Sequence, residues 1–174
     1  MSKQSRLLAV DASILAGANR SSGACARTLE DIMKICHRVL VNPDVLAEWT
    51  KHQTEYARKW RAMMNGKKKL VPVVANSTAV EAEIQAKVPP QNTAEKRALL
   101  KDAHLLAVAL AGDRVLLTAD LRLADLCEKH EVQTGRIEWL KLNPSNTVAQ
   151  NQTIANRLRD LTTTRPSPPL PAKT

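Results

Sequence analysis

The sequence predicts an α/β fold built on a mostly parallel sheet. Short apolar runs of strand length alternate along the chain with longer segments whose apolar residues recur at helical spacing. This alternation is typical of parallel strands that are joined by helices. The chain has 174 residues, with 44% hydrophobic and 25% charged residues. These values suit one soluble domain of ordinary size with a tail, and they disfavour a disordered chain, a collagen or a coiled coil.

The N-terminal part supplies two predicted strands and the helix between them. Leu7–Val10 is an apolar run that ends at Asp11, as expected of a buried strand. A helix over Gly23–Cys36 follows, because its apolar residues fall on one face. His37–Val41 is the second apolar run and the second predicted strand.

A strong helix start follows the second strand. Asn42 is a favoured N-cap residue, Pro43 suits the first helical position, and Asp44 places an acid in the first turn. Asn65 and Gly66 form a usual helix end. We therefore expect one long helix across this stretch. Its apolar stripe consists of Val45, Trp49, His52, Tyr56, Trp60 and Met63.

The second half of the chain continues the alternation. Leu70–Ala75 is an edge strand or a loop, because Pro72 cannot donate a backbone hydrogen bond. A capping-box variant at Asn92–Glu95 opens a helix that ends near Gly112. Three further elements complete the predicted order: a strand over Val115–Thr118, a helix over Leu121–His130 and a strand over Ile137–Leu142.

The composition changes after Asn143. Asn, Gln and Thr dominate as far as Leu161, and four of the nine prolines lie in Pro166–Pro171. We therefore expect a folded domain over residues 1–143 and a polar, Pro-rich tail over residues 144–174, with one helix and then disorder. A peptide that docks on a partner is the alternative. The helix is suggested by a weak apolar stripe of Val148, Ile154, Leu158 and Leu161.

The balance of charge indicates a polyanionic partner. The chain has 26 Lys+Arg against 17 Asp+Glu, a net charge of +9, which favours nucleic acid or an anionic membrane surface. Phe is absent, and three of the four aromatic residues share one helical stretch. A sheet that stacks bases on aromatic side chains is therefore disfavoured. The aromatic set is Trp49, Tyr56, Trp60 and Trp139.

Cysteine usage and hydropathy indicate the expected cellular location. Cys25, Cys36 and Cys127 are odd in number and lack a framework spacing, which fits a reducing cytoplasm. Asp11 interrupts the N-terminal apolar run, so we expect no signal peptide. No stretch approaches transmembrane length, and we expect a cytoplasmic protein with no membrane partner.

Two carboxylates follow predicted strands. Asp11 comes directly after the first strand, and Asp120 lies two residues beyond Thr118. In open parallel sheets, ligands bind beyond the carboxyl ends of the strands. Each acid has an alternative role as a helix N-cap, which Asp fills well.

Asp102 lies within an otherwise apolar predicted helix. Its spacing from the neighbouring leucines turns it toward the buried face. Buried carboxylates are rare unless they are paired or bind a metal. Pairing with Lys101, Arg97 or His104 is the alternative.

Glu48 has a similar position one turn into the helix that begins after Asn42. Its alternative is a solvated side chain paired with Lys51 or His52. Taken together, the four acids suggest one site. Carboxylate clusters bind Mg²⁺ or Mn²⁺, and such ions activate water and stabilise charge on a phosphodiester.

The sequence resembles the PIN-domain nucleases over about residues 7–142. The resemblance rests on the order and spacing of four short motifs: Leu8–Ser13, Val41–Glu48, Asp102 within Lys101–Leu110, and Val115–Asp120. It implies a three-layer α/β/α sandwich, a divalent-metal site and hydrolysis of RNA phosphodiesters. Many bacterial members are toxins that a partner antitoxin holds inactive, and many dimerise. The implied partners are therefore RNA, an antitoxin protein and a second copy of the chain.

The resemblance also implies roles for single residues. The catalytic acids are Asp11, Glu48, Asp102 and Asp120. We expect all of these except Glu48 to hold Mg²⁺ or Mn²⁺ partly through water, and Glu48 to orient the attacking water or complete the cluster. Ser13 matches a hydroxyl position near the metal, with ordinary turn capping as the alternative.

Two further positions qualify the resemblance. Thr118 matches a second hydroxyl position near the metal, and turn capping is again the alternative. Family members often carry another acid two residues after the final Asp. Here that position holds Arg122, with Asp125 further on as an accessory candidate. This departure leaves room for a first metal and argues against a second. A PIN-like domain that binds RNA or a protein without cutting is therefore the main alternative function.

Other site types fit less well. A haloacid-dehalogenase-type phosphatase needs a second Asp where this chain has Ser13, and a receiver domain needs an N-terminal acid pair. A zinc site lacks a framework spacing. A plain α/β domain without a nucleic-acid role is the last alternative. The residues considered for zinc are Cys127, His130, Cys36 and His37.

Most of the positive charge lies in residues 51–69. This stretch contains seven cations and one acid, Glu55, and it begins just after Glu48. We expect a positive track that binds the RNA backbone beside the acidic site, with a solvated basic face as the alternative. The cations are Lys51, Arg58, Lys59, Arg61, Lys67, Lys68 and Lys69.

Overall fold

A five-stranded parallel sheet forms the centre of the molecule. The computed structural model describes residues 5–19, 23–133, 135–149 and 151–163. The strands follow the order β3-β2-β1-β4-β5, and every neighbouring pair is parallel. The predicted α/β fold with a parallel sheet is therefore confirmed. The strands are β1 (Leu7–Val10), β2 (Arg38–Val41), β3 (Leu70–Pro72), β4 (Val115–Thr118) and β5 (Glu138–Lys141).

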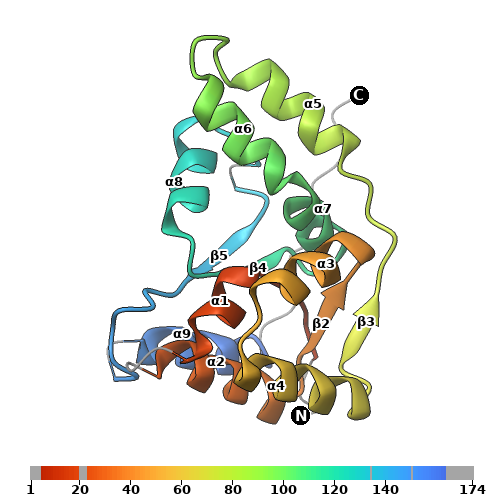
Figure 1. Ribbon diagram of the computed structural model, residues 1–174, viewed down its shortest axis with the longest axis vertical. Coiled ribbons are helices and arrows are strands. Elements are labelled where there is room, and N and C mark those ends of the chain that lie inside the picture. The colour runs from red at the N-terminus through yellow and green to blue at the C-terminus, as the bar shows by residue number, and fades with distance from the viewer. Residues whose placement is uncertain (1–4, 20–22, 134, 150, 164–174) are drawn as a thin grey trace.

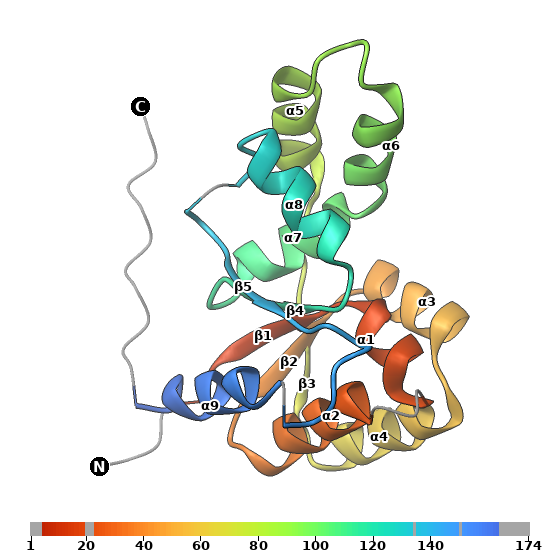
Figure 2. The ribbon, with the colours of Figure 1, turned by 90° about the vertical axis from the view of Figure 1, so that its left-hand side faces the viewer.

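Helices cover both faces of the sheet, so the molecule is a three-layer α/β/α sandwich (Figure 1). Figure 2 shows one helical layer below the sheet and a taller layer above it. The lower layer holds α2 (Ala24–Lys34), α4 (Glu55–Gly66) and α9 (Gln152–Asp160). The upper layer holds α5 (Thr78–Lys87), α6 (Thr93–Lys101), α7 (Ala103–Ala111) and α8 (Leu121–Lys129). Two short helices follow the carboxyl end of β1: α1 (Ala12–Ala16) and the 3-10 helix η1 (Gly17–Asn19). Helix α3 (Pro43–His52) follows the carboxyl end of β2.

The strand order reverses beside β1. From β1 the chain moves outward to β2 and β3, and it then crosses back to place β4 on the other side of β1. The carboxyl ends of β1 and β4 therefore border the topological switch point, where ligands bind in open α/β sheets. Both strands are buried almost throughout, and the backbone N–H of Asp11 donates to the carbonyl of Leu117 at 2.9 Å. This bond ties the ends of the two strands together.

The long helix expected from Asn42 to Asn65 is wrong, because the structure breaks it. Gln53 has extended backbone, and the Thr54 side chain caps α4 by accepting a hydrogen bond from the Ala57 N–H at 3.2 Å. The apolar stripe starts anew after the break. Met64 is therefore buried, whereas Met63 is exposed.

The helix expected over residues 93–111 is also interrupted. It forms α6 and α7, and Asp102 stands between them as the C-cap of one and the N-cap of the other. Helix α5 was not predicted. Its sequence gathers few apolar residues on one face, although Val80 and Ile84 are buried.

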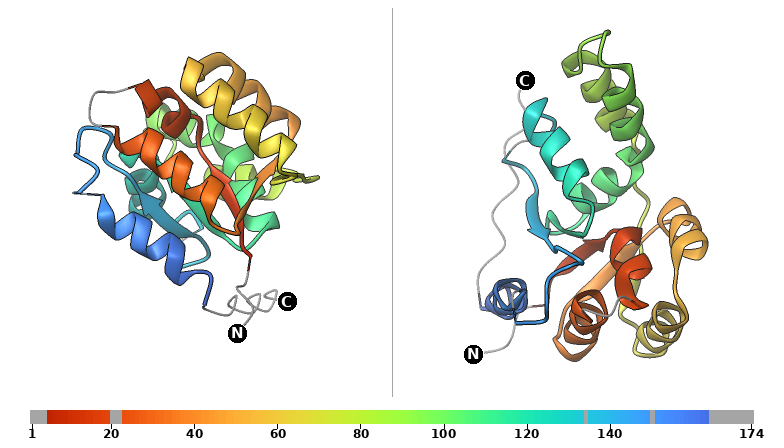
Figure 3. Two further views of the ribbon diagram at one scale, coloured as in Figure 1. Left: turned by 90° about the horizontal axis from the view of Figure 1, so that it is seen from below. Right: turned by 60° about the vertical axis from the view of Figure 1, so that its left-hand side comes forward.

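The segment after Asn143 packs on the domain as far as the structure describes it. Its helix α9 lies beside α2, and α2 lies beside α4 in turn (Figure 3). Leu158 and Leu161 are buried in the same core as the sheet. Residues 164–174, which include the Pro-rich stretch, lie outside the described residues. Among the described helices, none combines the length and apolar composition that a bilayer span requires.

Candidate functional site

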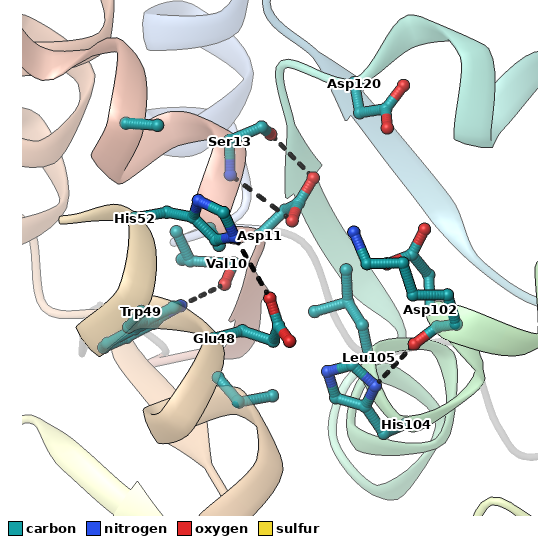
Figure 4. Close-up of a pocket in the computed structure, with 14 residues that line it drawn as sticks. Val10, Asp11, Ser13, Glu48, Trp49, His52, Asp102, His104, Leu105 and Asp120 are labelled. Atoms are coloured by element: carbon teal, nitrogen blue, oxygen red, sulfur yellow. Dashed lines mark hydrogen bonds and ion pairs between the residues drawn. The ribbon is translucent and has the colours of Figure 1, made fainter. Parts of the chain in front are cut away.

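All four predicted acids line one pocket at the switch point of the sheet. The pocket has a volume of about 200 Å³ and lies where β1, α3, α7 and the start of α8 meet. Figure 4 shows the four carboxylates around the same space, each from a different segment of the chain. The structure thus brings together side chains that are far apart in the sequence: Asp11, Glu48, Asp102 and Asp120.

Asp11 is held by two hydroxyl groups. Its Oδ2 accepts hydrogen bonds from Ser13 Oγ and from Thr118 Oγ1, each at 2.6 Å. Its Oδ1 accepts a long bond of 3.4 Å from the Ser13 N–H, which makes Asp11 the N-cap of α1. The capping role and the position in the pocket therefore coexist, and the carboxylate has a fixed orientation.

The same hydroxyls connect Asp11 to the loop after β4. Ser13 Oγ accepts from the Ala119 N–H at 2.9 Å, and Thr118 Oγ1 accepts from the Asp120 N–H at 2.9 Å. Asp120 in turn caps α8, because its Oδ1 accepts from the Leu123 N–H at 3.2 Å. The relative positions of the two aspartates are thus set by a continuous network of hydrogen bonds.

Glu48 reaches the pocket from α3. The adjacent Trp49 is fully buried, and its Nε1 donates to the carbonyl of Val10 at 3.0 Å, which holds α3 against the end of β1. The Glu48 carboxylate lies 3.1 Å from Lys51 Nζ and 3.4 Å from His52 Nε2. Its hydrogen bond with Lys51 is the main reason that the pKa of Glu48 lies below its usual range. Glu48 is therefore paired and anionic within the pocket.

Asp102 is partly buried, and its carboxylate lies close to the other acids of the site. It lies at the break between α6 and α7, and no hydrogen bond to its carboxylate is present among the described residues. Burial first, and then the nearby charge of Asp11, raise the pKa of Asp102 to about 6, with smaller contributions from Asp120 and Glu48. A cation in the pocket would relieve this repulsion.

The donor set suits a hard divalent cation that keeps part of its water shell. Within the described ranges, no three acidic, histidine or cysteine side chains are close enough to form a ready-made metal site. The carboxylates instead line the pocket from different sides (Figure 4). Mg²⁺ sheds water reluctantly and is commonly bound through one or two carboxylates with water in the other positions. The residues therefore fit Mg²⁺ or Mn²⁺ held partly through water.

Sequence reasoning did not select three nitrogen-bearing side chains that line the pocket. Lys101, His52 and His104 contribute to its wall beside the acids. His104 Nδ1 donates to the carbonyl of Lys101 at 3.0 Å, so Nε2 takes no part in this hydrogen bond. For Lys101 and His104, the signal that could have found them was their position close to Asp102 in the chain.

Two predictions about accessory groups have different outcomes. Ser13 and Thr118 contact Asp11 directly, as described above. Asp125 does not line the pocket. It is exposed on α8, and its carboxylate lies 3.3 Å from Lys141 Nζ.

The predicted positive track does not run along one side of the pocket. Lys51 is close to the site but pairs with Glu48, and Lys59 pairs with Glu55 at 2.8 Å. Arg61 donates to Thr50 Oγ1 at 3.1 Å, and Arg58 lines a separate groove of about 410 Å³. Lys67 and Lys68 follow α4, next to the amino end of β3. Because the strands are parallel, that end of the sheet is opposite the pocket.

Lys69 has a structural role that the sequence did not reveal. Its Nζ donates to the carbonyls of Ile32 and Met33 at 2.6 and 2.9 Å, and also to that of Ile35. These carbonyls lie at the C-terminal end of α2, where a cation is favoured. Lys69 therefore caps α2, and its ammonium group is not presented to a ligand.

The residues considered for zinc are occupied elsewhere. His37 is fully buried; its Nδ1 accepts from the Arg6 N–H at 3.1 Å, and its Nε2 contacts the carbonyl of Leu158 at 2.6 Å. His130 Nε2 lies 2.6 Å from the Glu95 carboxylate. Burial raises the pKa of the Cys127 thiol to about 12, which disfavours the thiolate that zinc requires.

Comparisons with known proteins leave the resemblance as an expectation. No family model matches the sequence, and no curated protein matches it. The functional assignment therefore rests on the residues of the pocket.

Proposed function

We propose that the chain is a divalent-metal-dependent endoribonuclease of the PIN type. The observation that carries this proposal is the convergence of four carboxylates on one pocket at the switch point of a parallel sheet. The donor set supports Asp11, Asp102 and Asp120 as the residues that hold Mg²⁺ or Mn²⁺. When bound, such an ion activates water and stabilises charge that develops on a phosphodiester.

The protein side chains supply orientation and charge. Ser13 and Thr118 fix the Asp11 carboxylate through two bonds of 2.6 Å, so its position is set before any ligand enters. Glu48 is anionic and stands across the pocket, where it orients the water that attacks the phosphorus. Lys101 adds a positive charge to the pocket wall, which offsets the repulsion between the acids and a phosphodiester.

The test is a cleavage assay on single-stranded RNA with Mg²⁺ or Mn²⁺. We expect Asp11→Asn and Asp120→Asn to reduce cleavage to the level of a metal-free control, because each variant removes a negatively charged ligand. Asp44→Asn is the matched control, since Asp44 is an exposed acid of α3 outside the pocket. Wild-type rates in both pocket variants would rule out this site.

The alternative is a PIN-like domain that binds RNA or a protein partner without cutting. Arg122 in place of a second acid favours it, as does the lack of a ready-made cluster among the described acids. A titration with Mg²⁺ or Mn²⁺ distinguishes the two. The nuclease gains thermal stability that depends on Asp11, whereas an inert domain does not.

The proposed role in the cell follows from the family resemblance. Many bacterial PIN nucleases are toxins, so an antitoxin protein and a second copy of this chain are proposed partners. The antitoxin would be encoded beside this gene. Copurification of the chain with the product of an adjacent small reading frame, and its effect on cleavage, would test this role.

A further inference from the structure

Two exposed cations lie on α6, and one of them lines the pocket. Arg97 and Lys101 are exposed, and neither forms an ion pair with the residues that the structure describes. They are four positions apart, so they are neighbours on one face of the helix. On the predicted track, Lys51 and Lys59 are each paired with a glutamate. Arg58, Lys67 and Lys68 are exposed and form no ion pair among the described residues, but none of them lines the pocket.

Lys101 is directly part of the pocket wall. It lines the pocket together with Asp102 and Glu48. The pKa of Glu48 is lowered mainly by Lys51, and Lys101 contributes to the same shift. Its ammonium group is therefore close enough to act on the acids, and it remains available to a phosphate.

The packing of α6 turns Arg97 away from the rest of the upper layer. Glu95 is held to α8, because its carboxylate lies 2.7 Å from Lys129 Nζ and 2.6 Å from His130 Nε2. Arg97 is two residues further on, about 200° around the helix, and so it projects to the other side. Figure 2 shows α6 above α3. Residues of α3 and Lys101 at the end of α6 both line the pocket.

We propose that Arg97 and Lys101 bind successive phosphates of a single-stranded RNA and lead the strand along α6 into the carboxylate pocket. This inference rests on the proposed nuclease function and identifies its substrate-binding surface. Four helical residues span about 6 Å along the axis, so the two cations follow one strand. Lys101 binds the phosphate nearest the acids, and Arg97 binds the next one outward. The binding surface is thus α6, on the upper layer, and not α4.

The salt dependence of binding tests this assignment. Binding of a labelled single-stranded RNA is measured by fluorescence anisotropy over a series of salt concentrations, with chelator present so that no turnover occurs. Each phosphate contact contributes about 0.7 to the slope of log K against log salt. We expect the double variant Arg97→Gln/Lys101→Gln to bind more weakly and to lose about 1.4 from that slope.

Two further double variants make the result specific. Arg38→Gln/Arg136→Gln removes two exposed cations far from α6 in the sequence and should keep the wild-type slope. Lys67→Gln/Lys68→Gln tests the surface that the sequence suggested, and it should also keep that slope. Thermal unfolding of each variant checks that the fold is retained.

The contrary outcomes are distinct. An unchanged slope in Arg97→Gln/Lys101→Gln overturns the inference, and so does an equal loss in all three double variants, since binding would then follow net charge alone. Because the measurement needs no cleavage, it stands apart from the proposed function. Loss of cleavage in Asp11→Asn with an unchanged slope in the α6 variant would leave the nuclease in place and remove only this surface.

Discussion

Three of the four pocket acids have a structural task as well as the proposed chemical one. Asp11 and Asp120 cap helices through backbone N–H groups, and Glu48 pairs with two neighbours on its own helix. Sequence reasoning could anticipate both roles, because capping follows from local position and the pocket follows from the ends of the strands. It could not choose between them, and the structure contains both.

Asp102 gives the sharpest residue-scale prediction. Its pKa of about 6 lies above the ordinary value of 3.8. Between these two pH values the folded protein binds more protons than the unfolded chain, so the wild type loses stability as the pH rises through that window. We expect Asp102→Asn to be more stable than the wild type by about 2–3 kcal/mol at pH 8 in metal-free buffer, with the difference vanishing below pH 4.

Urea unfolding at both pH values measures this difference. Asp125→Asn is the control, because its carboxylate is exposed and lies outside the pocket. A destabilised Asp102→Asn at pH 8 would contradict the charge repulsion assigned to the metal-free pocket.

The role of Lys69 as the cap of α2 could not be predicted from the sequence. Its charge grouped it with Lys67 and Lys68 in the sequence. Its carbonyl partners lie 34 to 37 positions earlier in the chain, and local patterns do not reveal such contacts. Only the tertiary fold shows that this lysine caps α2.

At the scale of elements, the strands were predicted well and the helix boundaries less so. Apolar runs located β1, β2 and β4, because buried parallel strands leave a continuous apolar signature. The run at Leu70–Ala75 left a loop open as the alternative, and β3 at the edge of the sheet is only partly buried. The break at Thr54 lacks glycine or proline, so apolar periodicity continued across it without interruption. The break at Asp102 was hidden in the same way, although it places the acid in the pocket.

The cap at Thr54 is open to a direct test. Thr54→Ala removes the oxygen that accepts from the Ala57 N–H, and we expect a loss of about 1 kcal/mol in the free energy of unfolding. Thr54→Ser keeps this oxygen and should restore most of the stability. Denaturant unfolding of the two variants measures the difference. Equal stability of Thr54→Ala and the wild type would show that the cap does not hold the start of α4.

At the scale of the whole molecule, α9 belongs to the packed domain. Arg6 Nε donates to the carbonyl of Leu161 at 3.1 Å, and His37 contacts that of Leu158, so both ends of the described chain meet beside β1 and β2. A weak apolar stripe predicted the helix, but its polar surroundings suggested a tail. The decisive contacts come from residues over 100 positions away, which composition does not report.

The contribution of α9 follows from its buried leucine. Leu158 has no exposed surface, and we expect Leu158→Ala to lower the free energy of unfolding by about 2–5 kcal/mol. Thr153→Ala, on the exposed side of the same helix, should change it by less than about 0.5 kcal/mol. Thermal or denaturant unfolding compares the two. Similar small losses in both variants would indicate that α9 contributes little to the fold.

The central claim is that the carboxylate pocket is a metal-dependent ribonuclease site, and Asp102→Asn tests it most directly. This variant is expected to be more stable than the wild type at pH 8 in metal-free buffer, and the urea unfolding described above checks that it is folded before its activity is compared. The measurement is cleavage of single-stranded RNA with Mg²⁺ or Mn²⁺ at that pH. We predict that the wild type cuts and that Asp102→Asn gives only the rate of a metal-free control. Cleavage by Asp102→Asn at the wild-type rate would contradict the account.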